Sequence, residues 1–370
     1  MFLQKLSLIN FKNYRETELI FSEKVNCFVG NNGAGKTNLL DAIYYLSFCK
    51  SYFNSVDSQN ILHSENFFTI QGLYKKDNTS SNSIHCVQKR NQRKQFKINK
   101  KDYERFADHI GHFPLVIITP LDNNLINNGS EERRKYFDGV ISQFDKIYLD
   151  NLLNYNKAVS QRNSLLKNFA ENHYFDKDSL EIWDEQLINL GSRIFEKRKQ
   201  FLKDFASIFQ EYYDFITLKK ESVNVVYESH LETKSFDLLL KESIERDRML
   251  KYTSTGIHKD DFIFKINDFP LKKFGSQGQQ KSYLVALKLA QFDYIKKVKK
   301  IKPILLLDDI FDKLDILRIQ QIMKLVSDNN FGQIFITDTS KERIIQIFKD
   351  IETKFEIFEI FDGMVEDSND

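Results

Sequence analysis

Two segments that lie far apart in the chain carry residues suited to binding a phosphorylated nucleotide. The first is GNNGAGKT, which has the spacing of a phosphate loop and follows the apolar run VNCFV at 25–29. In such a loop the glycines let backbone N–H groups curl around a phosphate, the lysine neutralises its charge, and the threonine hydroxyl suits Mg²⁺. The residues expected to bind the phosphates of a nucleotide are Gly30, Asn31, Asn32, Gly33, Ala34, Gly35, Lys36 and Thr37. A chance glycine-rich turn is the alternative, but it leaves the flanking strand and helix patterns unexplained.

The second segment is ILLLDD, in which four apolar residues precede two carboxylates. This run predicts a buried strand next to the phosphate-loop strand, with its carboxyl end at the ligand edge of the sheet. We expect Asp308 to hold Mg²⁺ together with Thr37, and Asp309 to polarise the attacking water. A solvated strand end is the alternative, although adjacent carboxylates repel each other when no cation is near.

A third segment, FGSQGQQKS at 274–282, precedes a long amphipathic stretch. Ser276 is a suitable N-cap and Gly278 leaves the backbone room, so N–H groups at the start of the helix stay available to an anion. A plain N-capped helix is the alternative. The chain therefore offers a second phosphate cradle far from the first.

Hydrophobic patterning places these segments in an α/β framework. Apolar alternation or continuous apolar runs predict strands at 3–9, 17–21, 25–29, 115–119, 223–229, 262–269, 303–309 and 333–339. Short β segments between 67 and 98 are typical of an antiparallel sheet, and long helices are expected in most of 119–251. We expect Ser130 to be the N-cap of the first of these helices, and VEDSND at the end of the chain to be a loose acidic tail.

Bulk composition indicates a globular protein of the cytoplasm. The chain has 370 residues, 41% of them hydrophobic and 29% charged, and its net charge of +2 neither demands nor excludes a nucleic acid. The three cysteines form no CxxC pair and the seven histidines show no H-x-x-x-H spacing, which argues against a zinc site. The sequence has neither the continuous apolar core of a signal peptide nor a stretch as long as a membrane span, so no membrane partner is expected.

Together these segments resemble the ABC-type ATPase heads of the SMC class and, within it, the RecF family. The resemblance rests on segments that follow the family's order over nearly the whole chain: LSLINFKNY, GNNGAGKTNLLDAIYYLS, LINNGSEERRKYFD, GIHKDDF, FGSQGQQKS, LLLDDIFDKLD and QIFITDT. It implies an α/β fold in which 1–118 and 301–370 form a P-loop ATPase head with a mixed sheet. Residues 119–300 would form a mostly helical lobe that carries the third segment, without a long coiled coil.

The resemblance also explains the second cradle. In this class two subunits dimerise head to tail on ATP, and the signature of one caps the γ-phosphate held by the other. The residues implied for this trans signature are Ser276, Gln277, Gly278 and Gln279. Asp315 matches the D-loop that communicates across the dimer, and Thr337 the switch position. Lys36, Asp309 and Thr337 are then the candidate catalytic residues of a weak, DNA-stimulated ATPase that times a clamp.

The biological role is likewise implied by the resemblance. It is ATP-dependent binding to DNA at single-strand gaps and single-strand/double-strand junctions, in recombinational repair and replication restart. The protein would help a recombinase to load and support SOS induction, with RecR as partner and RecO and RecA as indirect partners. Three positions depart from the family pattern: Ile257 and Lys259 stand where Pro and Arg are common, and Leu121 where an acid is common.

One basic segment is a candidate surface for DNA. Seven cations crowd a predicted hairpin region: Lys89, Arg90, Arg93, Lys94, Lys97, Lys100 and Lys101. Lysine and arginine at this density can neutralise several phosphates and give salt-dependent, sequence-independent affinity. An ordinary solvated surface is an equally good explanation.

Two other classes of ATPase have to be weighed. A transporter subunit is disfavoured because the signature is SQGQQ rather than LSGGQ, and because the segment between phosphate loop and signature is too long. An ATPase of the overcoming-lysogeny-defect type would carry a further acidic nuclease domain after the ILLLDD strand, so this chain would have to lack it. DNA-stimulated ATP hydrolysis would separate the RecF-like function from a transporter.

Overall fold

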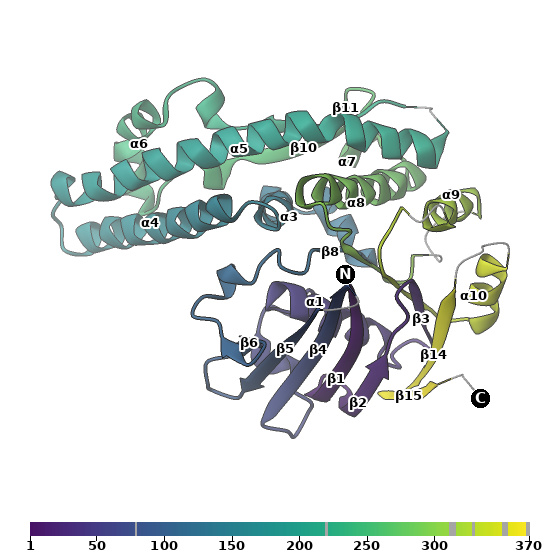
Figure 1. Ribbon diagram of the computed structural model, residues 1–370. Coiled ribbons are helices and arrows are strands. Elements are labelled where there is room, and N and C mark those ends of the chain that lie inside the picture. Colours follow the sequence, from purple (N-terminus) through teal and green to yellow (C-terminus); the bar gives the residue numbers. More distant parts are fainter. Residues whose placement is uncertain (78–79, 219–220, 311–315, 328–329, 350–353, 368–370) are drawn as a thin grey trace. The chain divides into compact units, whose positions relative to one another are not determined.

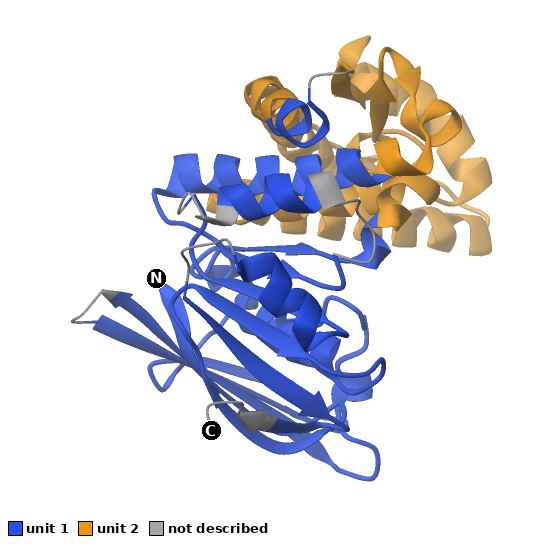
Figure 2. Ribbon diagram, turned by 90° about the vertical axis from the view of Figure 1, so that its right-hand side faces the viewer, with its two compact units in different colours: residues 1–122, 212–219, 281–370 blue, residues 123–211, 220–280 orange. Residues whose placement is uncertain are grey.

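The computed structural model describes residues 1–77, 80–218, 221–310, 316–327, 330–349 and 354–367. The chain forms two compact units, drawn in different colours in Figure 2. Unit 1 comprises residues 1–122, 212–219 and 281–370, and unit 2 comprises residues 123–211 and 220–280. Unit 2 thus lies within the range 119–300 that the sequence assigns to the helical lobe, while residues 281–300 belong to unit 1.

Unit 1 contains an antiparallel sheet with the order β2-β1-β4-β5-β6-β7. Its strands are β1 Phe2–Phe11, β2 Tyr14–Ile20, β4 Phe67–Asp77, β5 Ser80–Lys89, β6 Gln95–Ile98 and β7 Lys101–Asp102. The pairing of β1 with β4 shifts register between Leu3 and Lys5. Because of this shift, Leu3 and Leu6 are both buried, although side chains three positions apart on a regular strand point to opposite faces.

The second sheet of unit 1 carries the candidate site and has the order β15-β14-β3-β13-β12-β8. Its strands are β3 Val25–Val29, β8 Leu115–Ile118, β12 Ile304–Leu307, β13 Ile334–Asp338, β14 Phe355–Phe361 and β15 Met364–Asp367. All neighbours pair in parallel except β14 and β15, which form a hairpin. The four strands β3, β8, β12 and β13 are buried along their whole length, as continuous apolar runs in a covered parallel sheet require.

Strand β15 corrects the sequence-based expectation for the C-terminus. The expected loose acidic tail at 365–370 is wrong for its first residues, because Val365 pairs with Ile360 and Glu366 with Glu359, while residues 368–370 lie outside the described residues. Alternation in FEIFEIF followed by a glycine is the pattern of a hairpin, and it continues into the acidic residues. Figure 1 shows this yellow hairpin near the purple strand β2, which β15 contacts.

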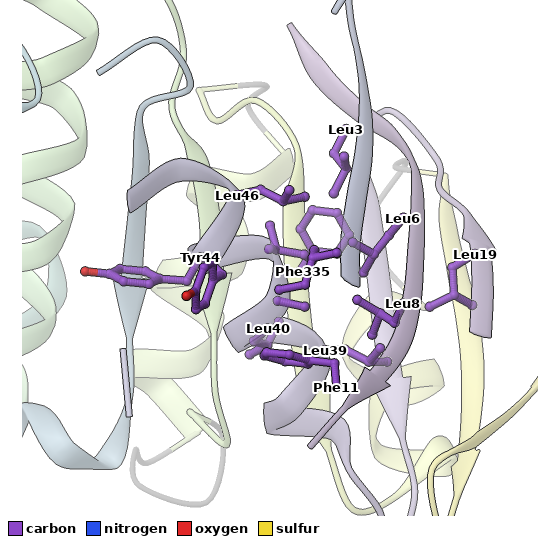
Figure 3. Packing of buried hydrophobic residues seen from close by; sticks show 14 of the residues in the cluster. Leu3, Leu6, Leu8, Phe11, Leu19, Leu39, Leu40, Tyr44, Leu46 and Phe335 are labelled. Carbon is purple, nitrogen blue, oxygen red and sulfur yellow. The ribbon is translucent and has the colours of Figure 1, made fainter. Parts of the chain in front are cut away.

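Helix α1 (Lys36–Phe48) connects the two sheets, because it contacts β1, β4 and β5 of the first and β8 and β13 of the second. A single apolar cluster joins Leu6 and Leu8 of β1, Leu39 and Leu46 of α1, and Phe335 of β13, as Figure 3 shows. The phosphate loop therefore leads into a helix that is fixed on both sides. The other helices of this unit are α9 Ile316–Ser327, α10 Lys341–Phe348 and most of α8 Gln277–Lys299.

Unit 2 is mostly helical, with a small antiparallel sheet in the order β11-β10-β9. Its elements are α2 Asn124–Asn127, α3 Ser130–Ser142, α4 Lys146–Glu171, most of α5 Lys177–Thr217, β9 Val223–Glu228, α6 Phe236–Leu250, β10 Asp261–Ile266, β11 Phe269–Pro270 and α7 Leu271–Phe274. The expected N-cap Ser130 is wrong: Gly129 is the cap, and Ser130, inside the helix, accepts a hydrogen bond from Arg134 through its hydroxyl. Among the described residues no helix has both the length and the apolar character needed to cross a bilayer.

Two fully buried arginines hold unit 2 together. The Arg162 guanidinium lies 2.6 Å from carboxylates of both Asp184 and Asp247. The Arg198 guanidinium lies 2.9 Å from Asp138 and 3.1 Å from Asp260. Each arginine thus links helices to segments distant in sequence through charge-assisted hydrogen bonds, which are stronger and more directional than neutral ones.

Candidate nucleotide-binding site

The predicted phosphate loop connects β3 to α1 in unit 1. Residues 31–33 are exposed at its tip, and residues 34–36 are buried. Gly35, with a φ of +119°, is the N-cap of α1 and has no side chain with which to satisfy the first N–H groups of the helix. Those donors therefore remain available to an anion. A side chain at position 35 would also overlap Asn13 and Tyr14.

Lys36 folds back over the loop instead of pointing into solvent. Its ammonium group donates to the carbonyl oxygens of Gly30 at 2.7 Å and Asn31 at 3.0 Å. The residue is 4% exposed, so its positive charge is concentrated at the loop. An ammonium group held by neutral carbonyls at a helix N-terminus is a favourable environment for the negative charge of a phosphate.

The predicted acidic partner lies beside the loop. The Thr37 hydroxyl donates to the Asp308 carboxylate at 2.9 Å, and the Thr337 hydroxyl donates to the same oxygen at 2.9 Å. The backbone N–H of Asp309 donates to the Thr337 hydroxyl at 2.9 Å. Burial raises the pKa of Asp308, while the two hydroxyls and the neighbouring Lys36 oppose this increase. A buried carboxylate next to a threonine hydroxyl is the donor set that Mg²⁺ prefers, so these residues fit the expected ion.

The strand order corrects one sequence-based expectation. The Asp308 strand β12 was expected to be the neighbour of the phosphate-loop strand β3, but β13 lies between them. Thr337 is on β13, and its Cα pairs with that of Phe28 on β3. The intervening strand therefore brings Thr337 into contact with both carboxylates that follow β12. Thr37 still reaches Asp308 because it lies on α1, beyond the end of β3.

The expected signature segment begins helix α8 in unit 2. Ser276 and Gln279 form a capping box, in which the Ser276 N–H donates to the Gln279 side chain at 2.7 Å and the Gln279 N–H to the Ser276 hydroxyl at 3.2 Å. The Gln279 amide also donates to Glu221 at 2.8 Å. Ser276 and Gln277 are exposed and Gly278 is half-buried. Asp315, expected in the D-loop, lies outside the described residues.

The basic segment is not uniform. Lys89, Arg90, Arg93, Lys100 and Lys101 are exposed, and Lys97 is half-buried beside Asp102 at 3.3 Å. Lys94 differs, because its side chain is 8% exposed and its ammonium group lies 2.7 Å from Asp57. It also donates to the Tyr45 hydroxyl at 2.9 Å and stacks over that ring. Lys94 therefore serves the core and is left out of the candidate DNA surface.

Two turn residues that the sequence did not single out donate to the same carbonyl of the phosphate loop. Asn13, between β1 and β2, donates to the Ala34 carbonyl at 2.9 Å, and the N–H of Gly363, between β14 and β15, donates to the same oxygen at 2.9 Å. Asn13 could have been noticed because asparagine favours turns and this one lies between two segments with strand-like alternation. Gly363 could have been found as the single glycine after FEIFEIF.

This geometry defines a class of protein. A phosphate loop between a central parallel strand and a helix, paired carboxylates two strands away, a threonine between them and a second helix that starts with a capping box are typical of the ATPase heads of SMC-type proteins. The profile of the RecF/RecN/SMC N-terminal domain family matches residues 2–360.

Relatives narrow this class to one family. The DNA replication and repair protein RecF of Phocaeicola vulgatus is 52% identical over 366 residues, which cover 99% of this chain and 98% of that protein. The RecF protein of Flavobacterium johnsoniae is 54% identical over 360 residues, 97% of this chain and 100% of its own. The chain belongs to the RecF family of DNA replication and repair proteins.

Solved structures agree with this assignment. The recombination mediator protein RecF-ATP of the RecFOR pathway superposes with a TM-score of 0.89 at 34% identity, covering 99% of this chain and 97% of that one. An SMC head bound to the C-terminal winged-helix domain of ScpA matches with a TM-score of 0.58 at 15% identity, covering 100% and 98% of the two chains. The second likeness concerns the fold alone and confirms the α/β SMC-type head predicted from the sequence.

Proposed function

We propose that this chain binds ATP and Mg²⁺ at its phosphate loop, dimerises on ATP, and acts on gapped DNA as a recombination mediator of the RecFOR pathway. The observation that carries the proposal is the hydrogen-bonded set of Thr37, Asp308, Thr337 and Asp309 beside the loop. These groups come from three separate elements and meet at the carboxyl ends of parallel strands, where ligands bind in such sheets.

Each residue has a distinct role in this proposal. The N–H groups of residues 33–37 bind phosphate oxygens, and Lys36 exchanges its two carbonyl partners for the β- and γ-phosphates. Thr37 and Asp308 hold Mg²⁺, which neutralises phosphate charge when bound. Asp309 orients the attacking water, and Thr337 fixes the backbone from which Asp309 projects. An aspartate reaches less far than a glutamate, so we expect slow, DNA-stimulated hydrolysis that times a clamp.

Dimerisation supplies the second cradle. Ser276, Gln277, Gly278 and Gln279 of one subunit cap the γ-phosphate held by the other, with the capping box keeping the start of α8 in shape. Because ADP lacks this phosphate, only ATP bridges the two subunits. Asp315 is proposed to communicate across the same interface. ATP therefore controls when the clamp closes.

DNA is the proposed substrate of the clamp. The exposed or half-buried cations Lys89, Arg90, Arg93, Lys97, Lys100 and Lys101 form the candidate surface. They contact phosphates rather than bases, so the protein recognises the form of a gap or junction and not its sequence. The solved relative described above is a recombination mediator in the RecFOR pathway. This supports RecR as the partner here, with RecO and RecA acting downstream.

Light scattering coupled to size exclusion tests the proposal. Wild type and Lys36→Met are compared with ATP and with ADP, each with and without gapped duplex. Lys203→Met, an exposed lysine of α5, is the matched control. We expect the mass to double only with ATP, in wild type and Lys203→Met. A constant mass in all conditions, or dimerisation of Lys36→Met on ATP, would contradict the proposed gating.

A further inference from the structure

Two turns from opposite ends of the chain meet at the phosphate loop. The Asn13 side chain, in the turn between β1 and β2, donates to the Ala34 carbonyl at 2.9 Å and accepts from the Asn38 amide at 2.7 Å. The Tyr14 hydroxyl donates to the Gly35 carbonyl at 3.1 Å. The first turn of the chain thus contacts both the loop and the first turn of α1.

The second turn makes this arrangement tight. Gly363, between β14 and β15, has a φ of +77°, and its N–H donates to the Ala34 carbonyl at 2.9 Å. A Cβ at this position would overlap the backbone carbonyl of Asn13. One carbonyl oxygen of the phosphate loop therefore receives hydrogen bonds from both turns, which are packed against each other.

Planarity of the peptide bond gives these contacts a consequence for phosphate binding. The Ala34 carbonyl and the Gly35 N–H belong to one trans peptide unit, so they point in opposite directions. When the two turns hold the carbonyl on their side, the Gly35 N–H is directed to the other side of the loop. Tyr14 acts in the same way on the next peptide unit, which carries the Lys36 N–H. The backbone donors are thereby oriented before a ligand arrives.

We propose that Asn13 is a positioning residue that orients the phosphate-loop donors through the Ala34 carbonyl, and that Gly363 completes this brace. The inference rests on the proposed binding of ATP, but it concerns the loop itself and has its own observable. Without the brace the loop samples other conformations, and a ligand must select the competent one, which lowers the apparent affinity. A well-made hydrogen bond to a backbone carbonyl corresponds to about a tenfold effect.

The test combines hydrogen–deuterium exchange of the peptide covering residues 30–37, without nucleotide, with titration of a fluorescent ATP analogue. Asn13→Ala removes the contact. Asn13→Asp is nearly isosteric, keeps the acceptor for Asn38 and loses the donor to Ala34. Asn38→Ala leaves the Ala34 contact intact, and Asn154→Ala, exposed on α4, is the matched control. Gly363→Ala disturbs the same contact from the other turn, because its Cβ would overlap the Asn13 carbonyl.

We expect Asn13→Ala, Asn13→Asp and Gly363→Ala to accelerate exchange in the loop peptide and to lower the affinity for the ATP analogue about tenfold. Thermal unfolding is recorded for each variant. Asn38→Ala should lower the affinity for the ATP analogue less than about threefold, and Asn154→Ala should have the wild-type affinity. If Asn13→Asp shows the same exchange rate and the same affinity as wild type, the proposed positioning role of Asn13 is wrong. If wild type fails to bind the analogue while Asn13→Asp still loosens the loop, the proposed nucleotide function falls and the brace stands.

Discussion

The buried carboxylate of the candidate site in unit 1 and the two buried arginines of unit 2 are stabilised in different ways. In unit 1 the buried carboxylate of Asp308 lies at a strand end and receives hydrogen bonds from the hydroxyls of Thr37 and Thr337. In unit 2 the buried guanidinium groups of Arg162 and Arg198 each lie between two carboxylates. Charge in unit 2 is neutralised by the chain itself, whereas the Asp308 set is suited to an added cation. The Asp308 carboxylate, which is held by hydroxyls and not placed between countercharges as the two arginines are, is therefore the candidate for a cation site.

The same contrast applies to the segments that carry the family resemblance. In unit 2, Arg133 of GSEERRKYFD donates two hydrogen bonds, at 2.8 and 2.9 Å, to the carboxylate of Asp261 of GIHKDDF. Arg134 donates to the Asp260 carbonyl at 2.6 Å. These two motifs therefore bind each other. At the departure Ile257 the side chain is buried, and the backbone carbonyl accepts a hydrogen bond from Arg198 at 2.9 Å.

The largest effect is expected on stability, when one of the buried arginines of unit 2 is removed. Arg198→Ala leaves Asp138 and Asp260 without their cation, which should lower the unfolding free energy of unit 2 by about 3–5 kcal/mol. Trp183, the one tryptophan of the chain, lies on α5 in unit 2, so its fluorescence during urea unfolding measures this loss. Affinity for an ATP analogue in the absence of urea should change less than about twofold.

The control for this prediction lies on the same helix. Arg193 is exposed, and Arg193→Ala should stay within about 0.5 kcal/mol of wild type. If the two arginine variants lose equal stability, burial of the ion pairs is not what holds unit 2 together, and the contrast between the units disappears.

The next largest effect is expected in the hydrogen-bonded set of Asp308, Asp309 and Thr337 in unit 1. Thr337→Val keeps the shape of the side chain but removes the hydroxyl that joins Asp309 to Asp308. Hydrogen bonds to charged groups contribute about 1.5–3 kcal/mol, so single-turnover ATP hydrolysis should slow about tenfold to a hundredfold. Binding of the ATP analogue should change less than about threefold, because the loop donors remain. Thr337→Ser should restore the rate, and a Thr337→Val variant as fast as wild type would remove Thr337 from the catalytic set.

A third prediction concerns acid stability, for which the units are alike. Burial lowers the pKa of His109 in unit 1 to about 4, and burial likewise lowers that of His258 in unit 2 to about 4. Below the ordinary histidine pKa of about 6.5 the unfolded chain takes up protons that the folded chain refuses, so stability falls as the pH falls. From pH 7.5 to 5 the His109 contribution should be about 2 kcal/mol.

Urea unfolding followed by circular dichroism at both pH values measures this term. His109→Gln should reduce the loss of stability between pH 7.5 and 5 by about 2 kcal/mol, whatever its effect at pH 7.5. His63→Gln, at an exposed position, is the control and should keep the wild-type pH dependence. An unchanged pH dependence in His109→Gln would mean that this histidine titrates normally in the folded protein.

Sequence patterns predicted the elements of the site more completely than its connections. Apolar runs ending in Gly30 or Asp308 indicate buried strands whose carboxyl ends meet, and both strands are present. The position of β13 between them could not be read from the sequence, because periodicity reports burial and not which strand pairs with which. The phosphate-loop spacing is different, since it encodes a local backbone shape that needs no distant partner.

Long-range contacts account for the remaining differences. Asn13 and Gly363 are separated by most of the chain, and only the meeting of two turns reveals their shared partner, Ala34. Lys94 looked like its basic neighbours because a lysine in a polar run is normally solvated. Its ion pair with Asp57 forms only when the turn between β5 and β6 packs against the residues that follow α1. Residue type alone does not distinguish a lysine that serves DNA from one that serves the fold.

The smallest expected effect makes this last distinction measurable. Lys100→Gln and Lys101→Gln each remove one exposed cation, so each should weaken binding to gapped duplex about threefold at physiological salt and reduce the salt slope by about one. Lys94→Met removes a cation of the same segment that is paired with Asp57, so it should lower the melting temperature and leave the salt slope unchanged. Fluorescence anisotropy between 50 and 200 mM salt, a range over which phosphate contacts are resolved, separates the two outcomes. If Lys94→Met reduces the slope and the two glutamine variants do not, DNA contacts the buried side of this hairpin and the candidate surface is misplaced.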